Sequence, residues 1–325
     1  MRRAIALAGL GTLAAMIAGS GSVSADSSRT DLKNYQHVFV IMMENTGYSQ
    51  LIGNPNAPWI NDAASKYGLA TNYTGVSHPS QPNYIAATSG SRNGVTGDAD
   101  TTINVPNIVD QLEGNGKSWR AYMQTYSTCA TQLQSLCPSP SLQLYARKHN
   151  PFVSYADVQN NPARMANVVD FSGLSADLAA GTVPDFAWIS PDQCHDMHGI
   201  GNPGPCNFGN VQGLISAGDT FLKDTVAAIT SSSAWTGNSV IFITWDETEF
   251  PFADVSGCCD AVPGGGHVVT LVISHSNHSA VTSGVAYNHY SMLRTIQDGW
   301  QLGCLGFTCD TANVPAMSDL TGPKG

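Results

Sequence analysis

The sequence is poor in charged residues, and positive charge is scarcest. Only 12% of the 325 residues are charged, and 14 Lys and Arg stand against 24 Asp and Glu. Proteins that bind nucleic acid draw most of their affinity from Lys and Arg contacts to phosphates, so this composition argues against a nucleic-acid partner. Any phosphate chemistry in such a chain must take its positive charge from another source, and a metal ion is the obvious one.

Long hydrophobic runs are also missing. The apolar run Ala4–Ala18 is short of the roughly 20 residues that a membrane-spanning helix needs, so we expect no integral membrane span. Arginines at positions 2 and 3 precede this run, and residues 23–25 offer small side chains behind it, which is the pattern of an export signal. We therefore expect a signal peptide at 1–25, a single domain at 26–325, and secretion to the cell envelope or beyond.

No C-x-x-C motif occurs among the eight cysteines, which disfavours a structural zinc site. An even number of cysteines in an exported chain favours disulfides instead. The pairing stays open at this point. Three pairs are close neighbours in sequence: Cys129 with Cys137, Cys194 with Cys206, and Cys304 with Cys309.

Apolar runs rich in β-branched residues recur along the chain. Their hydrophobicity is continuous rather than alternating, which is typical of strands buried on both faces of a sheet. These runs are His37–Met43, Phe186–Ile189, Ser239–Trp245 and Val268–Ile273. Stretches with helical apolar spacing alternate with them at Trp59–Tyr67, Asn107–Glu113, Asp219–Ser231 and Tyr290–Trp300, while 129–145 and 199–211 read as loops. The alternation predicts a layered α/β fold, with Asp219 capping its own helix.

Polar residues follow three of the expected strands. Glu44 and Asn45 follow the first, residues 191–198 the second, and Asp246 and Glu247 the third. Ligands of open α/β sheets bind beyond the carboxyl ends of the strands, and oxygen-rich side chains there suit a divalent cation. Each acidic residue alone is explained equally well as a helix cap or a turn former. Their coincidence on three strands favours a metal or catalytic role.

Ser80 is the candidate nucleophile. It lies in the segment HPSQPNYIAATSG, and the residues behind it read as a helix. Ser80 would then sit at a helix N-terminus, where free backbone N–H groups stabilise an oxyanion or a phosphate. An ordinary N-cap serine is the competing interpretation.

Eight segments in order resemble the alkaline phosphatase superfamily, and within it the bacterial phosphoesterase family that includes secreted acid phosphatases and phospholipases C. They extend from residue 38 to residue 296 and read VFVIMMEN, HPSQPNYIAATSG, SWRAYMQ, ARKHNPF, WISPDQCHDMH, GDTFLKD, ITWDE and NHYSMLRTI. The resemblance implies a three-layer α/β fold with a central, mostly parallel sheet. It also implies that residues 26–325 form one phosphoesterase catalytic domain.

The same resemblance implies roles for individual residues. Ser80 would form a phosphoserine intermediate. The metal ligands would be Glu44, Asn45, Ser80, Asp246 and Glu247. Contacts to the substrate phosphate are expected from His78, Asn83, His149, Asp196, His198 and His289, with His198 and His289 also acting as catalytic proton donors.

The pattern departs from that of the two-zinc members of the superfamily. Glu44 and Asn45 stand where those members carry one Asp, and Asp246 and Glu247 stand where they carry Asp and His. Harder oxygen ligands favour calcium, magnesium or manganese, although zinc is not excluded. We expect one divalent metal ion.

The function implied is that of a secreted, metal-dependent phosphomonoesterase of the acid phosphatase type. Its substrate would be a phosphorylated small molecule or a lipid headgroup, phosphoinositides included. A phospholipase C-type phosphodiesterase is the alternative among enzymes. A secreted protein that binds a ligand through a cation, without turnover, is the alternative from another class.

Overall fold

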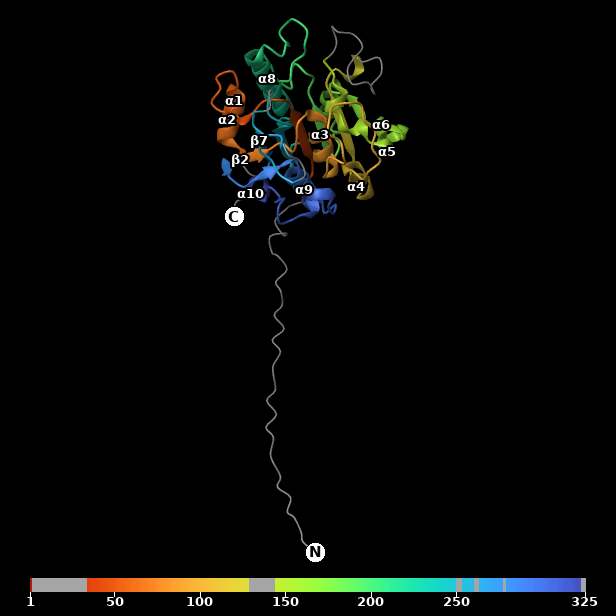
Figure 1. The fold of residues 1–325 in the computed structure, drawn as a ribbon. Helices are drawn as coiled ribbons and strands as arrows, with labels where there is room; N and C mark the ends of the chain where they lie inside the picture. The colour runs from red at the N-terminus through yellow and green to blue at the C-terminus, as the bar shows by residue number, and fades with distance from the viewer. Residues whose placement is uncertain (2–33, 129–143, 250–252, 260–262, 277–278, 323–325) are drawn as a thin grey trace. The chain divides into compact units, whose positions relative to one another are not determined.

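The structure is a computed structural model that describes residues 1, 34–128, 144–249, 253–259, 263–276 and 279–322 (Figure 1). The chain divides into two units, Met1–Thr30 and Asp31–Gly325, and the fold described here is that of the second. The expected signal peptide at 1–25 lies almost wholly outside the described residues. It stays a prediction.

A nine-stranded sheet forms the centre of the fold. The strands run in spatial order β4-β3-β5-β1-β6-β7-β2-β8, and β9 pairs with β2. Their bounds are β1 Val38–Met43, β2 Gly68–Thr74, β3 Trp119–Met123, β4 Val168–Asp170, β5 Phe186–Ser190, β6 Val240–Trp245, β7 His267–Ser274, β8 Val281–Ser283 and β9 Tyr287–Asn288. All four strands expected from the sequence are present.

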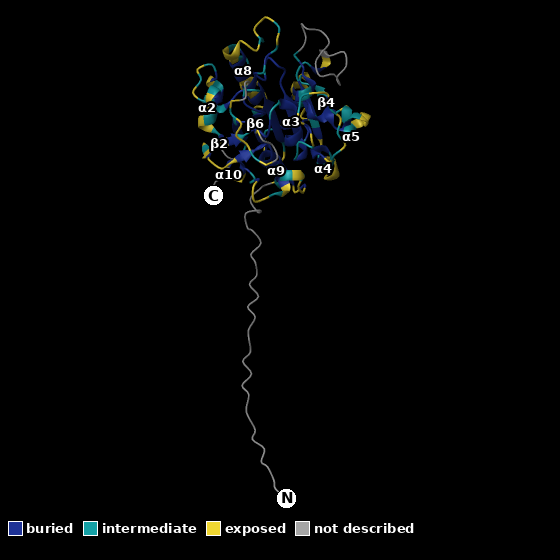
Figure 2. Ribbon diagram, viewed as in Figure 1, coloured by how far each residue is buried: buried dark blue, intermediate teal, exposed yellow. Residues whose placement is uncertain are grey.

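Most neighbouring strands are parallel. β1 pairs in parallel with β5 and β6, and β3 pairs in parallel with β4 and β5. β7 is antiparallel to both of its neighbours, β6 and β2. Every residue of β1, β5 and β6 is buried, as Figure 2 shows for the dark blue centre of the ribbon. The continuous hydrophobicity of these strands is therefore explained, and the predicted fold class is confirmed.

Helices connect the strands. Their bounds are α1 Tyr48–Leu51, α2 Pro58–Lys66, α3 Ser80–Ser89, α4 Ile108–Gly114, α5 Ala156–Gln159, α6 Pro162–Met165, α7 Ser172–Ala180, α8 Val211–Thr230, α9 His289–Trp300 and α10 Ser318–Thr321. Short 3₁₀ helices are η2 Tyr126–Thr128, η4 Arg147–His149, η5 Pro151–Ser154 and η6 Gly306–Cys309. The four predicted helices are all present, although α8 begins eight residues before the expected start at Asp219.

Asp219 caps a different helix from the one predicted. It lies inside α8, and its carboxylate accepts hydrogen bonds from the backbone N–H groups of Trp59 at 3.1 Å and Ile60 at 2.8 Å. Both donors belong to the first turn of α2, which packs against α8. The prediction that Asp219 caps its own helix is wrong, because the helix it belongs to starts further upstream.

Disulfides join all six of the cysteines that the structure describes. The bonds are Cys194–Cys206, Cys258–Cys259 and Cys304–Cys309. Two of these bonds join cysteine pairs already noted as close neighbours in the sequence, and the third joins two adjacent residues, a pairing that the sequence left open. Cys129 and Cys137 lie outside the described residues. No helix among the described residues is long and apolar enough to cross a membrane.

Candidate functional site

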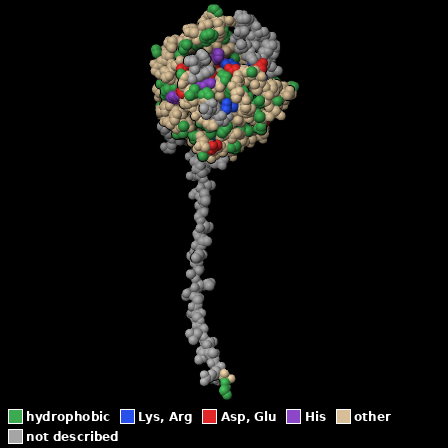
Figure 3. Space-filling view, in the orientation of Figure 1, with side chains coloured by type: hydrophobic (Ala, Val, Ile, Leu, Met, Phe, Trp, Pro, Cys, Tyr) green, Lys and Arg blue, Asp and Glu red, His purple; other side chains and the backbone are tan. Residues whose placement is uncertain are grey.

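The strand order brings together polar segments that are distant in sequence. β1 lies between β5 and β6, so the residues that follow these three parallel strands meet at one edge of the sheet. The backbone N–H of Glu44 donates to the carbonyl oxygen of Asp196 over 2.8 Å. That of Asn45 donates to Asp246 Oδ1 over 3.1 Å. In Figure 3, histidine, basic and acidic side chains gather near the top of the visible face.

Ser80 reaches the same edge from the end of β2. Gly75 lets the chain pass directly over the neighbouring backbone, since a Cβ there would lie 2.4 Å from the carbonyl oxygen of Asp246. Ser80 then opens α3 and is 1% exposed. Its hydroxyl lies 3.0 Å from Glu44 Oε2 and 3.1 Å from Glu247 Oε1, and its single proton can be donated to either carboxylate. The predicted nucleophile therefore touches two of its predicted metal ligands.

Asn83 shapes the loop that presents Ser80. Its Oδ1 accepts the N–H groups of Val76 at 2.8 Å and Ser77 at 3.0 Å, and its Nδ2 donates to the carbonyl oxygens of Ser77 at 2.7 Å and Pro79 at 3.3 Å. The side chain is fully buried. The backbone already occupies both of its polar atoms, which gives Asn83 a part in loop geometry, and its expected phosphate contact stays a prediction.

The carboxyl groups around Ser80 are crowded and buried. Burial, and then the charge of Asp246, raise the pKa of Glu44 well above its usual range. The pKa of Asp246 is raised by burial and by Glu247, and burial raises the pKa of Glu247 to about 8. Each group would hold its negative charge more easily if a cation lay among them.

Several buried oxygens in this cluster lack partners among the described residues. They are Glu44 Oε1, Asn45 Oδ1 and Asp246 Oδ2. Buried polar atoms are normally satisfied, and oxygens from carboxylates, an amide and a hydroxyl are the ligands that calcium, magnesium and manganese prefer. The predicted set of Glu44, Asn45, Ser80, Asp246 and Glu247 therefore fits a hard divalent cation.

His149 lies between two buried carboxyl groups. Its Nε2 is 3.1 Å from Glu44 Oε1 and its Nδ1 is 3.0 Å from Asp196 Oδ2, although neither contact meets the geometry of a hydrogen bond. Glu44, His149 and His198 each offer a ligand atom within 4.8 Å of the others. Burial and the charge of nearby Lys148 lower the pKa of His149 well below its usual value. The same two causes lower the pKa of His198 to about 4. Neutral imidazoles bind metals, so these two histidines are candidate ligands as well as phosphate contacts.

Asp196 contacts the backbone of His198 and faces the ring of His149. Its Oδ1 accepts the backbone N–H of His198 at 2.7 Å, while its Oδ2 faces His149. The carboxyl group is buried, and burial raises its pKa well above the usual range. A carboxylate in direct contact with phosphate would place two anions together, and the expected phosphate contact of Asp196 stays a prediction.

Two further predicted residues use both ring nitrogens within the protein. His78 Nδ1 contacts Glu247 Oε2, and its Nε2 lies 3.2 Å from the carbonyl oxygen of Asp254. His289 Nε2 lies 2.7 Å from the carbonyl oxygen of Asp246, and its Nδ1 lies 3.0 Å from Tyr73 Oη. Burial lowers the pKa of both histidines, that of His289 to about 4. These contacts tie both rings to Asp246 and Glu247, and the expected phosphate contacts of His78 and His289 stay predictions.

Lys148 is a site residue that the motifs did not single out. Its Nζ lies 3.3 Å from Ser80 Oγ, 2.9 Å from Asp98 Oδ2 and 3.4 Å from His198 Nε2. Burial acts to lower the pKa of Lys148, but the carboxylates of Glu44 and Asp98 outweigh it, so the net shift is upward and the ammonium stays charged. The sequence feature that could have identified Lys148 as a site residue is its position directly before His149 in the segment ARKHNPF. No sequence feature could have identified Asp98, because it lies in a loop without a recognisable motif.

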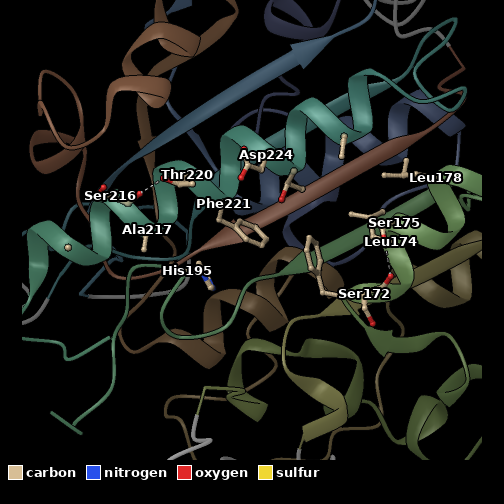
Figure 4. A pocket seen from close by; sticks show the side chains of 14 residues that line it. Ser172, Leu174, Ser175, Leu178, His195, Ser216, Ala217, Thr220, Phe221 and Asp224 are labelled. Atoms are coloured by element: carbon tan, nitrogen blue, oxygen red, sulfur yellow. Dashed lines mark hydrogen bonds between the residues drawn. The ribbon is translucent and has the colours of Figure 1, made fainter. Parts of the chain in front are cut away.

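An apolar groove of about 610 Å³ lies between α7 and α8, as Figure 4 shows. Leu174, Leu178, Ala217 and Phe221 contribute to its lining, and His195 lies at one end. Ser80 and its carboxylate neighbours are not among the lining residues. The groove is therefore distinct from the polar cluster.

Solved structures identify the fold. A phosphonate monoester hydrolase of Agrobacterium radiobacter matches with a TM-score of 0.57 and 13% identity, over 89% of this chain and 78% of that one. A protein of the alkaline phosphatase superfamily from Vibrio parahaemolyticus matches with a TM-score of 0.52 and 13% identity, over 84% of this chain and 68% of that one. At this level of identity the likeness shows that the chain shares the fold of these two proteins.

The sequence pattern of the Phosphoesterase family matches residues 54–303, and the chain belongs to that family. A probable acid phosphatase of Kluyveromyces lactis is 26% identical over 86% of this chain and 62% of its own length. A phosphatidylinositol-3-phosphatase of Mycobacterium tuberculosis is 27% identical over 98% of this chain and 94% of its own. An acid phosphatase of Aspergillus fumigatus is 24% identical, and this chain spans 66% of its length.

Proposed function

We propose that this chain is a secreted, metal-dependent phosphomonoesterase that works through a phosphoserine at position 80. One observation carries the proposal: a buried serine hydroxyl opens α3 while it touches the carboxylates of Glu44 and Glu247. A serine that contacts candidate metal ligands and stands at a helix N-terminus has both a means of activation and an anion-binding backbone beside it.

The residues support a two-step transfer. Ser80 Oγ attacks phosphorus and gives its proton to one of the two carboxylates it touches, so that an O–P bond forms while the bond to the leaving oxygen breaks. The leaving oxygen departs toward the solvent side of the site, where His198 and Lys148 are partly exposed, and takes its proton from a solvent water. Water then attacks the phosphoserine and restores the hydroxyl, with release of inorganic phosphate.

Glu44, Asn45, Asp246 and Glu247 would hold the divalent ion beside Ser80, and His149 and His198 would offer further ligand atoms close to Glu44. Such an ion lowers the pKa of a hydroxyl that it contacts and neutralises charge on the phosphoryl oxygens. His78 would position Glu247, because its ring contacts that carboxylate. His289 would position Asp246, because its ring contacts the backbone carbonyl of that residue.

Secretion and substrate belong to the same proposal. Three disulfides support an oxidising compartment, in agreement with the export signal expected at 1–25. The acid phosphatase and phosphatidylinositol-3-phosphatase relatives support phosphomonoesters as substrates, with phosphoinositide headgroups among them.

The test compares a phosphate monoester, p-nitrophenyl phosphate, with a diester, p-nitrophenyl phosphorylcholine. Ser80→Ala should lose nearly all turnover of the monoester, and acid-quenched wild-type enzyme should yield a phosphorylated peptide that contains Ser80. Ser175→Ala, an exposed serine of α7, is the matched control and should keep full activity. Undiminished turnover by Ser80→Ala contradicts the mechanism. Preference for the diester would indicate the phospholipase C alternative, and lack of turnover by the metal-loaded wild type would indicate a binding protein.

A further inference from the structure

The cluster around Ser80 is strongly unbalanced in charge. Four buried carboxyl groups surround it, those of Glu44, Asp196, Asp246 and Glu247. A phosphate ester that approaches Ser80 is itself an anion, so these groups oppose its binding unless positive charge faces it. Side chains on the open side of Ser80 can add to the positive charge that a bound cation would supply, because the carboxylates occupy the closed side.

Lys148 occupies the open side. Its ammonium lies 3.3 Å from Ser80 Oγ, and its side chain is 16% exposed, whereas Glu44 and Asp246 are fully buried. When Ser80 Oγ attacks a phosphate ester, the oxygens on the phosphorus come close to Ser80 Oγ. They therefore fall within hydrogen-bond distance of the Lys148 ammonium. Arg147, the preceding residue, does not share this role, since its guanidinium donates to the carbonyl oxygens of Thr101 and Val153.

Asp98 fixes the position of that ammonium. Its Oδ2 accepts from Lys148 Nζ at 2.9 Å, and its Oδ1 accepts the backbone N–H of Gln81 at 3.0 Å. Gln81 directly follows Ser80 in α3. The carboxylate of Asp98 therefore links Lys148 to α3, the helix that begins at Ser80. This link restrains the distance between the Lys148 ammonium and Ser80.

We infer that Lys148 is a catalytic residue that selects the doubly charged phosphoryl group of monoesters, and that Asp98 is its positioning residue. The inference rests on the proposed function and extends it to specificity. A phosphate monoester carries close to two negative charges at neutral pH, because its second pKa is about 6, whereas a diester carries one. A fixed positive charge beside the reacting phosphorus favours the dianion.

The experiment measures kcat/KM of the metal-loaded enzyme for the monoester and the diester in parallel. Lys148→Met keeps the length of the side chain and removes its charge. It should lower kcat/KM for p-nitrophenyl phosphate by about 100-fold, as for the loss of a charge-stabilising donor, and should lower that for p-nitrophenyl phosphorylcholine by no more than about ten-fold. Lys148→Arg keeps the charge and should retain more of the monoester preference than Lys148→Met.

Asp98→Asn tests the positioning role. The amide oxygen can still accept from Gln81, so α3 should begin as before, while the charge that holds Lys148 is lost. The ratio of monoester to diester kcat/KM should fall in the same direction as in Lys148→Met, by a smaller factor. An unchanged ratio would remove Asp98 from this role.

Lys117 is the matched control. It also pairs with an aspartate, Asp185, at 3.1 Å, but both residues precede strands β3 and β5 and so lie at the opposite edge of the sheet. Lys117→Met should leave both substrates unaffected. Thermal melts of every variant check that the fold is kept.

Phosphate binding gives a readout that does not need turnover. In the Ser80→Ala background, calorimetry with inorganic phosphate should show at least about ten-fold weaker binding after Lys148→Met is added. A Lys148→Met enzyme within three-fold of wild type on the monoester, or an equal loss on both esters, would overturn the inference. Those results, with Ser80→Ala inactive, would leave the proposed function standing, whereas active Ser80→Ala would contradict the proposed function itself.

Discussion

The hydroxyl of Ser80 lies 3.0 Å from Glu44 Oε2, although 36 residues separate them in the chain. Glu44 is fixed by the end of β1, and Ser80 by the first turn of α3, so the contact joins the two elements on which the candidate site depends. Glu44 Oε1 also faces His149 Nε2 at 3.1 Å and has no hydrogen-bond partner among the described residues. It is the carboxylate that the oxygen-rich and imidazole-rich parts of the site share.

Replacement of Glu44 by Gln should separate metal binding from folding. The change removes a ligand charge, and we expect divalent-metal affinity to fall by at least about 100-fold, the upper end of losses seen when a group supporting a metal ligand is removed. The metal-free variant should be at least as stable as metal-free wild type at pH 8, because burial and Asp246 disfavour the Glu44 charge. Calorimetric metal titrations and urea denaturation measure both quantities. Asp62→Asn, an exposed residue of α2, is the control.

Removal of the metal should make stability depend on pH in a defined window. Burial raises the pKa of Glu247 from 4.5 to about 8, so the folded metal-free protein keeps a proton there that the unfolded chain has lost. The stabilisation from that proton is present below about pH 4.5 and is lost as the pH rises to about 8.

Histidines oppose this trend only at lower pH. His198 and His289 have a pKa of about 4 in the folded state against 6.5 when unperturbed, so they favour folding increasingly as the pH rises to 6.5 and not beyond. Between pH 6.5 and 8 the free energy of unfolding of EDTA-dialysed protein should therefore fall. Urea midpoints across this range test the expectation, and a rising midpoint would contradict it. Metal at 100 times its Kd should restore about 2.7 kcal/mol.

Replacement of Asn83 by Ala distinguishes loop support from phosphate binding. Four hydrogen bonds to the buried 76–79 backbone would be lost, so we expect a stability loss of roughly 3 kcal/mol together with lower kcat. A residue that only contacted phosphate would instead raise KM and leave the melting temperature alone. Asn72→Ala, at an exposed position of β2, should change stability by no more than about 0.5 kcal/mol.

Asp219 should matter for stability and not for catalysis. Asp219→Ala removes the acceptor for two N–H groups in the first turn of α2, which should cost about 1–2 kcal/mol in the free energy of unfolding. Activity of the folded variant should equal that of wild type. Asp224→Ala, an exposed residue of the same helix, serves as the comparison and should have little effect on either quantity.

Local patterns in the sequence determined the core strands and the residue types at their ends. β1, β5 and β6 are buried on both faces, and their unbroken hydrophobicity made them recognisable. Glu44 and Asp246 directly follow two of these strands, so a parallel arrangement was enough to bring them together. β2 and β3 were not predicted, because Asn72 and Arg120 interrupt the apolar pattern where the strands are only partly buried.

Tertiary structure alone decided how the loops meet around Ser80. Lys148 and Asp98 are 50 residues apart, and no periodicity or motif relates a lysine in a 3₁₀ helix to an aspartate in a loop. The side-chain amide of Asn83 bonds to the backbone of 76–79, a contact that no local sequence pattern indicates. Hydrophobic periodicity is a property of neighbouring residues, whereas these contacts depend on which strand ends the packed sheet places side by side.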